Sequence, residues 1–388
     1  MLNRRRLIPN LLAVTMLLST PYFAQSALAQ HGAIQMQGPV QNLPPDFMVD
    51  AKMRAQIIDN LSKKMRAFYV FPEIGEKMAA AIESHDKAGA YTHLSSANRL
   101  AAKLTEDLLA ISHDKHIRVM NSPDKVDDDI TAEQRANDKP SAEELASNAE
   151  FERSRNYGVE KYERLLGNIA YLELGGFLNA QTSGEVVAAA MTVASGANAL
   201  IIDLCRNGGG DPAMVALICS YLFDPEPVHL NDLYFRESNQ TRQFWTHAVV
   251  PGKRFGKDKP VYVLTSERTF SAAEEFSYNL KNLKRATLIG ATTGGGANPG
   301  DSYKLADHLT VFIPNGRAIS PITKTNWEGT GVTPHIAVPV DQALLTAQLL
   351  AMKPVLDTIK EDWRKQPLQR AIDDVQSKLN AMKTKAKN

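Results

Sequence analysis

A serine at the start of a helix is the first candidate for chemistry in this sequence. Residues 261–276 read VYVLTSERTFSAAEEF, in which an apolar strand leads through a short turn to Ser271 and a helical pattern. A hydroxyl there lies beside unpaired backbone N–H groups and the positive end of the helix dipole, which would stabilise an oxyanion. Ser271 and Glu274 also have the spacing of a capping box, so a purely structural role stays open.

A run of glycines ends a second apolar strand. Residues 201–212 read IIDLCRNGGGDP, which places Gly208, Gly209 and Gly210 between a strand and the helix that follows. Glycine lets the backbone approach a ligand closely and direct N–H groups at an anion. A phosphate-binding loop is not indicated, because no Gly-Lys-Ser/Thr follows and the spacing is not GxGxxG. An anion-binding backbone and a tight turn both remain open.

Two histidines could supply a base. His113 and His116 lie in SHDKHIRV at the end of a helical region. Their spacing lacks the i, i+4 pair and the intervening Glu of a zinc-binding helix, so a metal site is disfavoured. A solvated helix end that carries two histidines is the plain alternative to a catalytic base.

The elements that must position these residues divide the chain into segments. Apolar residues three and four apart predict helices between residues 48 and 111, and short apolar or β-branched runs alternate with helical patterns from residue 168 onward, which favours an α/β domain. We expect a signal peptide, a small helical domain, a charged connector, an α/β catalytic domain and a C-terminal helical segment, at residues 1–29, 30–121, 122–165, 166–340 and 341–388.

The first 29 residues have the pattern of a secretory signal peptide. Arg4–Arg6 form a positive region, an apolar run follows from Leu7 to Leu18, and Ala27-Leu28-Ala29 is a small-x-small cleavage site. The three arginines also fit a twin-arginine signal loosely. The sequence therefore predicts a periplasmic or secreted protein with no integral membrane segment after signal removal.

Composition excludes several classes of protein. The chain has 388 residues, of which 44% are hydrophobic and 22% charged, so it is not a wholly disordered chain. Its 44 Lys and Arg against 43 Asp and Glu leave no basic excess for nucleic acid. Cys205 follows a strand and Cys219 lies two turns up the next helix, so we expect two unpaired thiols.

Five motifs, taken in order, resemble the C-terminal processing (tail-specific) serine peptidase family. They are DKHI, DLCRNGGG, TFSAAEEF, IGATTGGGA and NWEGTGVTPHIAV, and they span about residues 50–340. The resemblance is to the branch with tricorn core peptidases and interphotoreceptor retinoid-binding protein. It implies a ClpP/crotonase-like α/β peptidase domain preceded by a small helical domain. Residues 117–167 leave no room for the PDZ domain of the other branch.

The resemblance also implies a role for individual residues. Ser271 matches the nucleophile, and the amides of Gly209 and Ala272 match the oxyanion hole. His116 matches the general base of the tricorn-like branch, and Glu328 matches the acid that helps to orient the site.

The motifs depart from the family at four places. Gly294-Gly295-Gly296 stands where the lysine branch has its catalytic Gly-Lys-Gly, which excludes a lysine base there. Lys115 replaces the hydroxyl residue before the base, where it could support His116. Cys205 replaces an arginine and His335 an aspartate. These changes put full activity in question.

The resemblance and the residues together predict an exported serine-type peptidase that cleaves peptide bonds through an acyl-enzyme on Ser271. No metal or organic cofactor is implied, and the expected partner is a peptide or protein substrate, with no nucleic acid. The oligomeric state stays open. The alternative is a weakly active or inactive family member that binds a hydrophobic ligand or a peptide.

Overall fold

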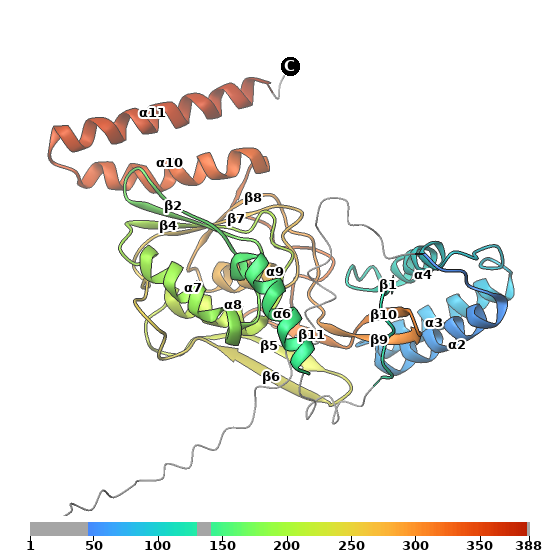
Figure 1. The fold of residues 1–388 in the computed structure, drawn as a ribbon. Coiled ribbons are helices and arrows are strands. Elements are labelled where there is room, and N and C mark those ends of the chain that lie inside the picture. Colours follow the sequence, from blue (N-terminus) through green and yellow to red (C-terminus); the bar gives the residue numbers. More distant parts are fainter. Residues whose placement is uncertain (1–45, 130–140, 386–388) are drawn as a thin grey trace, which may run out of the picture.

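A computed structural model describes residues 46–129 and 141–385 of the chain (Figure 1). The expected signal peptide lies outside the described residues. The helices are α2 (Ala51–Phe68), α3 (Pro72–Lys87), α4 (Ala97–Ser112), α6 (Ala142–Ser154), η1 (Asn156–Gly158), α7 (Ala180–Ala194), α8 (Pro212–Leu222), α9 (Ala272–Asn282), α10 (Val340–Thr358) and α11 (Asp362–Lys385). The strands are β1 (Arg118–Asn121), β2 (Val159–Leu165), β3 (Ile169–Leu174), β4 (Ala199–Asp203), β5 (His229–Phe235), β6 (Gln240–Trp245), β7 (Val261–Thr265), β8 (Thr287–Gly290), β9 (Gly300–Ala306), β10 (Leu309–Pro314), β11 (Gly316–Ile319) and β12 (Ile336–Ala337).

A six-stranded sheet forms the centre of the α/β body, in the order β12-β8-β7-β4-β3-β2. All neighbouring strands run parallel except β2, which pairs antiparallel with β3. Helices α7, α8 and α9 cover one face, and α10 and α11 cover the other (Figure 1). Because both faces are covered, the central strands are continuous apolar runs.

Alternation along β4 shows how the sequence builds the two layers. Leu200 and Ile202 join the core under α7, α8 and α9, whereas Ala199 and Ile201 join the core under α10 and α11. Successive side chains of a strand point to opposite faces, so one short apolar segment serves both cores.

A second body holds α2, α3 and α4 and also strands from the far half of the chain. Its three-stranded sheet has the order β1-β10-β9. Leu305 and Val311 of β9 and β10 lie in the same buried cluster as Leu61 of α2 and Leu104 of α4. The apolar run at residues 309–313 is thus a strand, as expected, but it completes the helical body and not the central sheet (Figure 1).

Strand β2 lies inside the segment that the sequence presented as a charged connector. In it only Val159 is fully buried, and its other side chains are partly or fully exposed. It is an antiparallel edge strand, which needs backbone pairing on one side only, so its charged side chains remain in solvent. This is why the apolar pattern that revealed β3 and β4 is absent from β2.

A third sheet has the order β11-β5-β6, and its strand β11 begins just after β10 ends. Both cysteines are free, as predicted, with Cys219 buried in α8. No helix among residues 46–129 and 141–385 is long and apolar enough to cross a membrane.

Candidate active site

Ser271 lies between the end of β7 and the first residue of α9. Its backbone has φ 55° and ψ −122°. A non-glycine residue with positive φ is held there by its surroundings, and such strain concentrates at functional sites. The turn therefore presents a half-buried serine at a helix N-terminus, as the sequence predicts.

The carboxylate of Glu274 fixes this turn from inside the protein. Glu274 is fully buried. It accepts hydrogen bonds from the N–H of Ser271 (2.9 Å), Gly295 (2.6 Å) and Gly296 (2.8 Å) and from the hydroxyl of Thr293 (2.5 Å). Burial raises the pKa of Glu274, and these four hydrogen bonds act in the opposite direction. Glu274 thus holds the backbone of Ser271 and the loop at residues 293–296 together.

Gly209 packs directly against the candidate nucleophile. Its φ is +110°, and a Cβ atom there would lie 2.7 Å from Ser271 Cβ and 2.9 Å from the nitrogen of Ala272. Only glycine fits at this approach. The Gly209 N–H donates to Oδ1 of Asn207 (2.9 Å), whose own Nδ2 donates to the carbonyl of Leu174 (3.0 Å).

The amide of Ala272 is the first in α9. Helix-start N–H groups have no partner within their own helix. In the part of the chain that the structure describes, the Ala272 N–H has no hydrogen-bond acceptor. Of the two amides expected to form an oxyanion hole, the Ala272 amide is therefore available, and the Gly209 amide is bonded to Asn207.

His116 lies in the turn between α4 and β1 and is buried in the interior. Its ring stacks at a tilt on the ring of Phe270, with centroids 4.6 Å apart, and Phe270 directly precedes Ser271. Its backbone N–H donates to Oδ1 of Asp114 (3.0 Å), and its Nδ1 lies 3.6 Å from the same oxygen. Neither ring nitrogen has a hydrogen-bond partner among the described residues.

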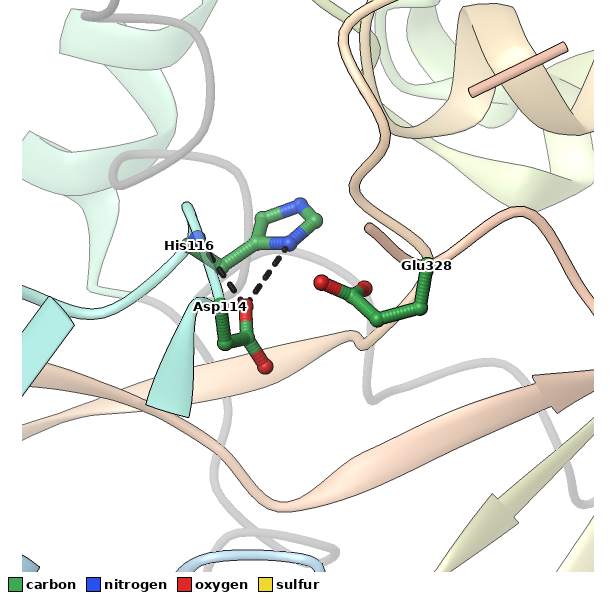
Figure 2. Close-up of side chains that lie close together, drawn as sticks. All are labelled: Asp114, His116 and Glu328. Atoms are coloured by element: carbon green, nitrogen blue, oxygen red, sulfur yellow. Dashed lines mark hydrogen bonds and ion pairs between the residues drawn. The ribbon is translucent and has the colours of Figure 1, made fainter. Parts of the chain in front are cut away.

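Glu328 approaches the same side of the imidazole. Figure 2 shows Asp114 and Glu328 near the Nδ1 edge of His116, with Nε2 turned away from both carboxylates. Oε2 of Glu328 accepts the N–H of Ala297 (2.6 Å), and its Oε1 is buried without a partner among the described residues. The pKa of Glu328 is raised to about 7, mainly by burial and to a smaller extent by the charge of Asp114.

Asp114 is the residue of this site to which the sequence assigned no role. Its Oδ2 accepts hydrogen bonds from Nδ2 of Asn298 (2.9 Å) and from the hydroxyl of Tyr69 (3.3 Å). It is almost fully buried and joins the helical body to the α/β body. The signal was present in the DKHI motif, but the distant partners, Asn298 above all, could not be read from it.

Lys115 and His113 point away from this cluster. Nζ of Lys115 donates to the carbonyl of Gly294 (2.5 Å), so it does not lie between Glu328 and His116. His113 is the exposed C-cap of α4, with φ 56°, and is not among the clustered side chains. A His113–His116 pair is thus not formed.

The glycines that replace the lysine of the other branch are required by close packing. A Cβ on Gly296 would lie 2.2 Å from Cζ of Phe270 and 2.7 Å from Cε1 of His116. Gly295 has φ +84°, and a Cβ there would meet the backbone at Gly331 at 3.1 Å. The loop therefore lies flat against the rings beside Ser271.

His335 has a local structural role in place of the expected aspartate. Its Nδ1 accepts the backbone N–H of Leu288 on β8 (3.0 Å). An aspartate oxygen can accept the same bond, so the replacement keeps the acceptor. The pKa of His335 is lowered by partial burial and by the charge of Lys281.

Two family models match the chain in consecutive segments. Peptidase family S41 matches residues 168–338, and the N-terminal domain of S41 peptidases in eukaryotic IRBP matches residues 51–154. Together they cover the α/β body and the helical body in the order found here. The chain belongs to peptidase family S41. This confirms the family that the motifs indicated and the α/β fold with a preceding helical domain, and only residues 155–167 separate the two matches, so no PDZ domain lies between them.

Solved structures similar to this S41 chain include three peptidase-related proteins. A candidate peptidase from Parabacteroides merdae is 21% identical with a TM-score of 0.48, over 74% of this chain and 89% of that chain. The photosystem II D1 C-terminal processing protease is 15% identical with a TM-score of 0.45, over 76% and 94%. The tricorn protease is 13% identical with a TM-score of 0.48, over 85% of this chain and 37% of the tricorn chain.

Proposed function

We propose that this S41 family member is an exported serine-type peptidase that cleaves peptide bonds through an acyl-enzyme on Ser271. The observation that carries the proposal is the placement of Ser271. It lies in a positive-φ turn at the start of α9, beside the available Ala272 amide and one residue from the ring that contacts His116. These contacts support the assignment of Ser271 as nucleophile, of the Ala272 amide as oxyanion donor and of His116 as base.

The steps follow from the chemistry of these groups. His116 accepts the proton of the Ser271 hydroxyl as its oxygen attacks the peptide carbonyl, and the Ala272 amide stabilises the resulting oxyanion. The imidazolium then gives its proton to the leaving amine, which leaves an ester on Ser271. Water, deprotonated by His116, hydrolyses the ester and restores the serine.

Asp114 and Glu328 act on His116 from its Nδ1 edge. A carboxylate at one ring nitrogen favours a proton there, which leaves the lone pair of Nε2 free to accept the proton of the serine. Glu328 thereby orients the base, as the resemblance implies, and Asp114 acts with it. Lys115 supports the site through the carbonyl of Gly294 and not through His116.

For the full mechanism, one hydrogen bond must form, between His116 and Ser271, and one must break, between Gly209 and Asn207. The ring nitrogens of His116 have no partner here, so His116 must come within about 3 Å of the Ser271 hydroxyl. For Gly209 to serve as a second oxyanion donor, its N–H must leave Asn207. Substrate binding between the two bodies would supply the energy for both changes.

The unpartnered ring nitrogens of His116 support the second function, a weakly active or inactive protein that binds a peptide or a hydrophobic ligand. An imidazole without a hydrogen bond to the serine fits a chain that has kept the fold and lost the base. Labelling by a fluorophosphonate separates the two functions, because the reagent needs an activated serine and no particular substrate.

The experiment uses the mature chain, residues 30–388, and a fluorescent fluorophosphonate. We expect labelling of the wild type, none of Ser271→Ala, and unchanged labelling of Ser302→Ala, an exposed serine of β9. His116→Ala should slow labelling by about 100-fold. Absence of wild-type labelling, or labelling that survives Ser271→Ala, contradicts the serine mechanism.

Export is tested separately from activity. The full chain, expressed in a bacterial host, should appear in the periplasmic fraction or in the medium with a new N-terminus at Gln30. A cytoplasmic chain that retains residues 1–29 would contradict export and leave the mechanism untouched.

A further inference from the structure

We propose that Asp114, His116 and Glu328 form a binding site for a divalent transition-metal ion of the zinc type, and that the bound ion withdraws His116 from catalysis. The first part stands on the geometry of the three side chains. The second part rests on the proposed function. The sequence alone indicated no metal, because two of these residues lie more than 200 positions from the third.

The three side chains offer a donor set that suits zinc. One ligand atom from each, an imidazole nitrogen and two carboxylate oxygens, lies within 4.8 Å of the others. Zinc binds such atoms at about 2.0 to 2.2 Å in a tetrahedral arrangement, which places neighbouring ligands about 3.3 Å apart. Nδ1 of His116 already lies 3.6 Å from Oδ1 of Asp114. Small rotations of the side chains would therefore close the site.

Atoms that face this site lack partners. Both ring nitrogens of His116 and Oε1 of Glu328 are buried without a hydrogen bond among the described residues. The exposed fraction of His116 is 5%. Buried polar atoms are nearly always paired, and leaving one unpaired costs about 1 to 3 kcal/mol. An ion would give Nδ1 and Oε1 the partners that the protein does not supply.

The remaining carboxylate oxygens are held by the surrounding protein. Oδ2 of Asp114 is bonded to Asn298 and Tyr69, and Oε2 of Glu328 is bonded to the N–H of Ala297. Such outer contacts are what orient ligands in metal sites. They leave Oδ1 of Asp114, which also accepts the N–H of His116, and Oε1 of Glu328 on the side of the imidazole.

The charge balance also favours a cation. Two carboxylates lie close together in the interior, and among residues 46–129 and 141–385 neither forms an ion pair with a lysine or an arginine. The nearest lysine in sequence, Lys115, donates to Gly294 instead. Like charges that are buried together are costly unless a proton or a cation is bound between them.

An ion on Nδ1 changes what Nε2 can do. Neutral imidazole carries one proton, so a metal on Nδ1 leaves that proton on Nε2. Nε2 is then a donor and has no lone pair to accept the proton of Ser271. Bound metal would therefore switch off the base without touching the nucleophile.

The test measures binding directly, with Co²⁺ and Zn²⁺ as probes and the mature chain as the protein. We expect equilibrium dialysis to show one bound Co²⁺ per chain. The bound Co²⁺ should have the visible absorption of an ion with fewer than six ligands, and Zn²⁺ should displace it. Glu328→Gln and His116→Ala should weaken binding by at least about tenfold. Ser271→Ala, and His229→Ala at the separate His229–Asp232 pair, should bind as the wild type does. A wild type that binds no ion, or variants that bind equally well, overturns the proposal.

A second measurement links binding to catalysis. Zn²⁺ should slow fluorophosphonate labelling of the wild type at the concentrations at which it binds, and a chelator should restore the rate. Labelling that is unaffected at saturating Zn²⁺ overturns the inhibitory part. Metal binding without any labelling would leave the metal site standing and contradict the proposed function, so the two failures are distinguishable.

Discussion

The carboxylate of Glu274 accepts the backbone N–H of Ser271 at 2.9 Å and, through its other oxygen, the N–H of Gly295 at 2.6 Å. One buried side chain therefore sets both the turn that presents the serine and the loop opposite it. The capping-box spacing visible in the sequence is thus combined with a contact that reaches 21 residues further along the chain.

Replacement of Glu274 by Gln should destabilise the protein. The amide keeps the size of the side chain, but its NH₂ group would face N–H donors, so at least one buried donor loses its acceptor. We expect a loss of about 2 to 3 kcal/mol in the free energy of unfolding, measured by urea denaturation. Glu267→Gln, at an exposed position five residues before α9, should change it by less than about 0.5 kcal/mol. Equal effects at the two positions would show that the buried contacts of Glu274 are not needed.

Replacement of Gly296 by Ala should displace the rings beside the serine. The new methyl group would lie 2.2 Å from Phe270 and 2.7 Å from His116, so both rings must move. We expect a cost of about 1 to 3 kcal/mol in stability and a loss of fluorophosphonate labelling. Gly196→Ala serves as the control, because a Cβ there meets nothing within 4 Å. Normal labelling of Gly296→Ala would mean that the positions of the rings do not matter for Ser271.

Glu275 should make stability fall as the pH rises. Burial raises the pKa of Glu275 to about 8, with a smaller contribution from Asp211. The folded protein then holds a proton that the unfolded chain releases near pH 4.5, so stability is greatest below that pH and is lost as the pH rises towards 8. A difference of one pKa unit between the folded and unfolded states corresponds to about 1.4 kcal/mol. Glu275→Gln should therefore be more stable than the wild type at pH 8, by about 2 to 5 kcal/mol.

The measurement for Glu275 is a series of thermal or urea unfolding curves between pH 4.5 and 8.5. The curves of wild type and Glu275→Gln should converge at the acid end and separate at the alkaline end. Glu185→Gln, at an exposed position of α7, should follow the wild type throughout. A constant difference between wild type and Glu275→Gln would contradict the titration of Glu275 in this range.

Replacement of Leu305 by Ala should destabilise the helical body, although Leu305 is far from it in sequence. Its side chain is fully buried in the cluster with α2 and α4. A buried Leu→Ala change costs about 2 to 5 kcal/mol. Differential scanning calorimetry should show a lower Tm, whereas Leu166→Ala, at an exposed position, should leave it nearly unchanged. A change of less than about 0.5 kcal/mol at Leu305 would contradict the shared core.

The sequence predicted the parts of this structure that depend on local pattern. The strands at residues 169–174 and 261–265 are apolar because both faces of the sheet are covered, and Ser271 follows a strand and starts a helix within a single turn of chain. The spacing of apolar residues, the residues that interrupt a helix or strand, and the residue types that start a helix all lie within short stretches of sequence. They can therefore be recognised without knowing the fold.

The parts that were missed depend on contacts between distant segments. The bond between Asp114 and Asn298 joins residues 184 positions apart, and no spacing rule predicts it. Strand β2 could not be predicted from the sequence because an edge strand needs little apolar surface, so its charged residues lack the apolar pattern of a strand. The position of the nitrogens of His116, which have no partner, depends on Phe270, Asp114 and Glu328 together and follows only from the packed structure.

The hairpin of β9 and β10 has a consequence for synthesis. Its residues are made after Ser271, yet β10 pairs with β1 and the hairpin shares a buried core with α2, α3 and α4. Strand β1 follows the turn that holds His116. A nascent chain that stops short of residue 314 therefore lacks the support for its base, however complete the earlier helices are. Under the proposed mechanism, such a chain would carry Ser271 but would lack the strands that position its base, so the serine could become reactive only after the hairpin had been made.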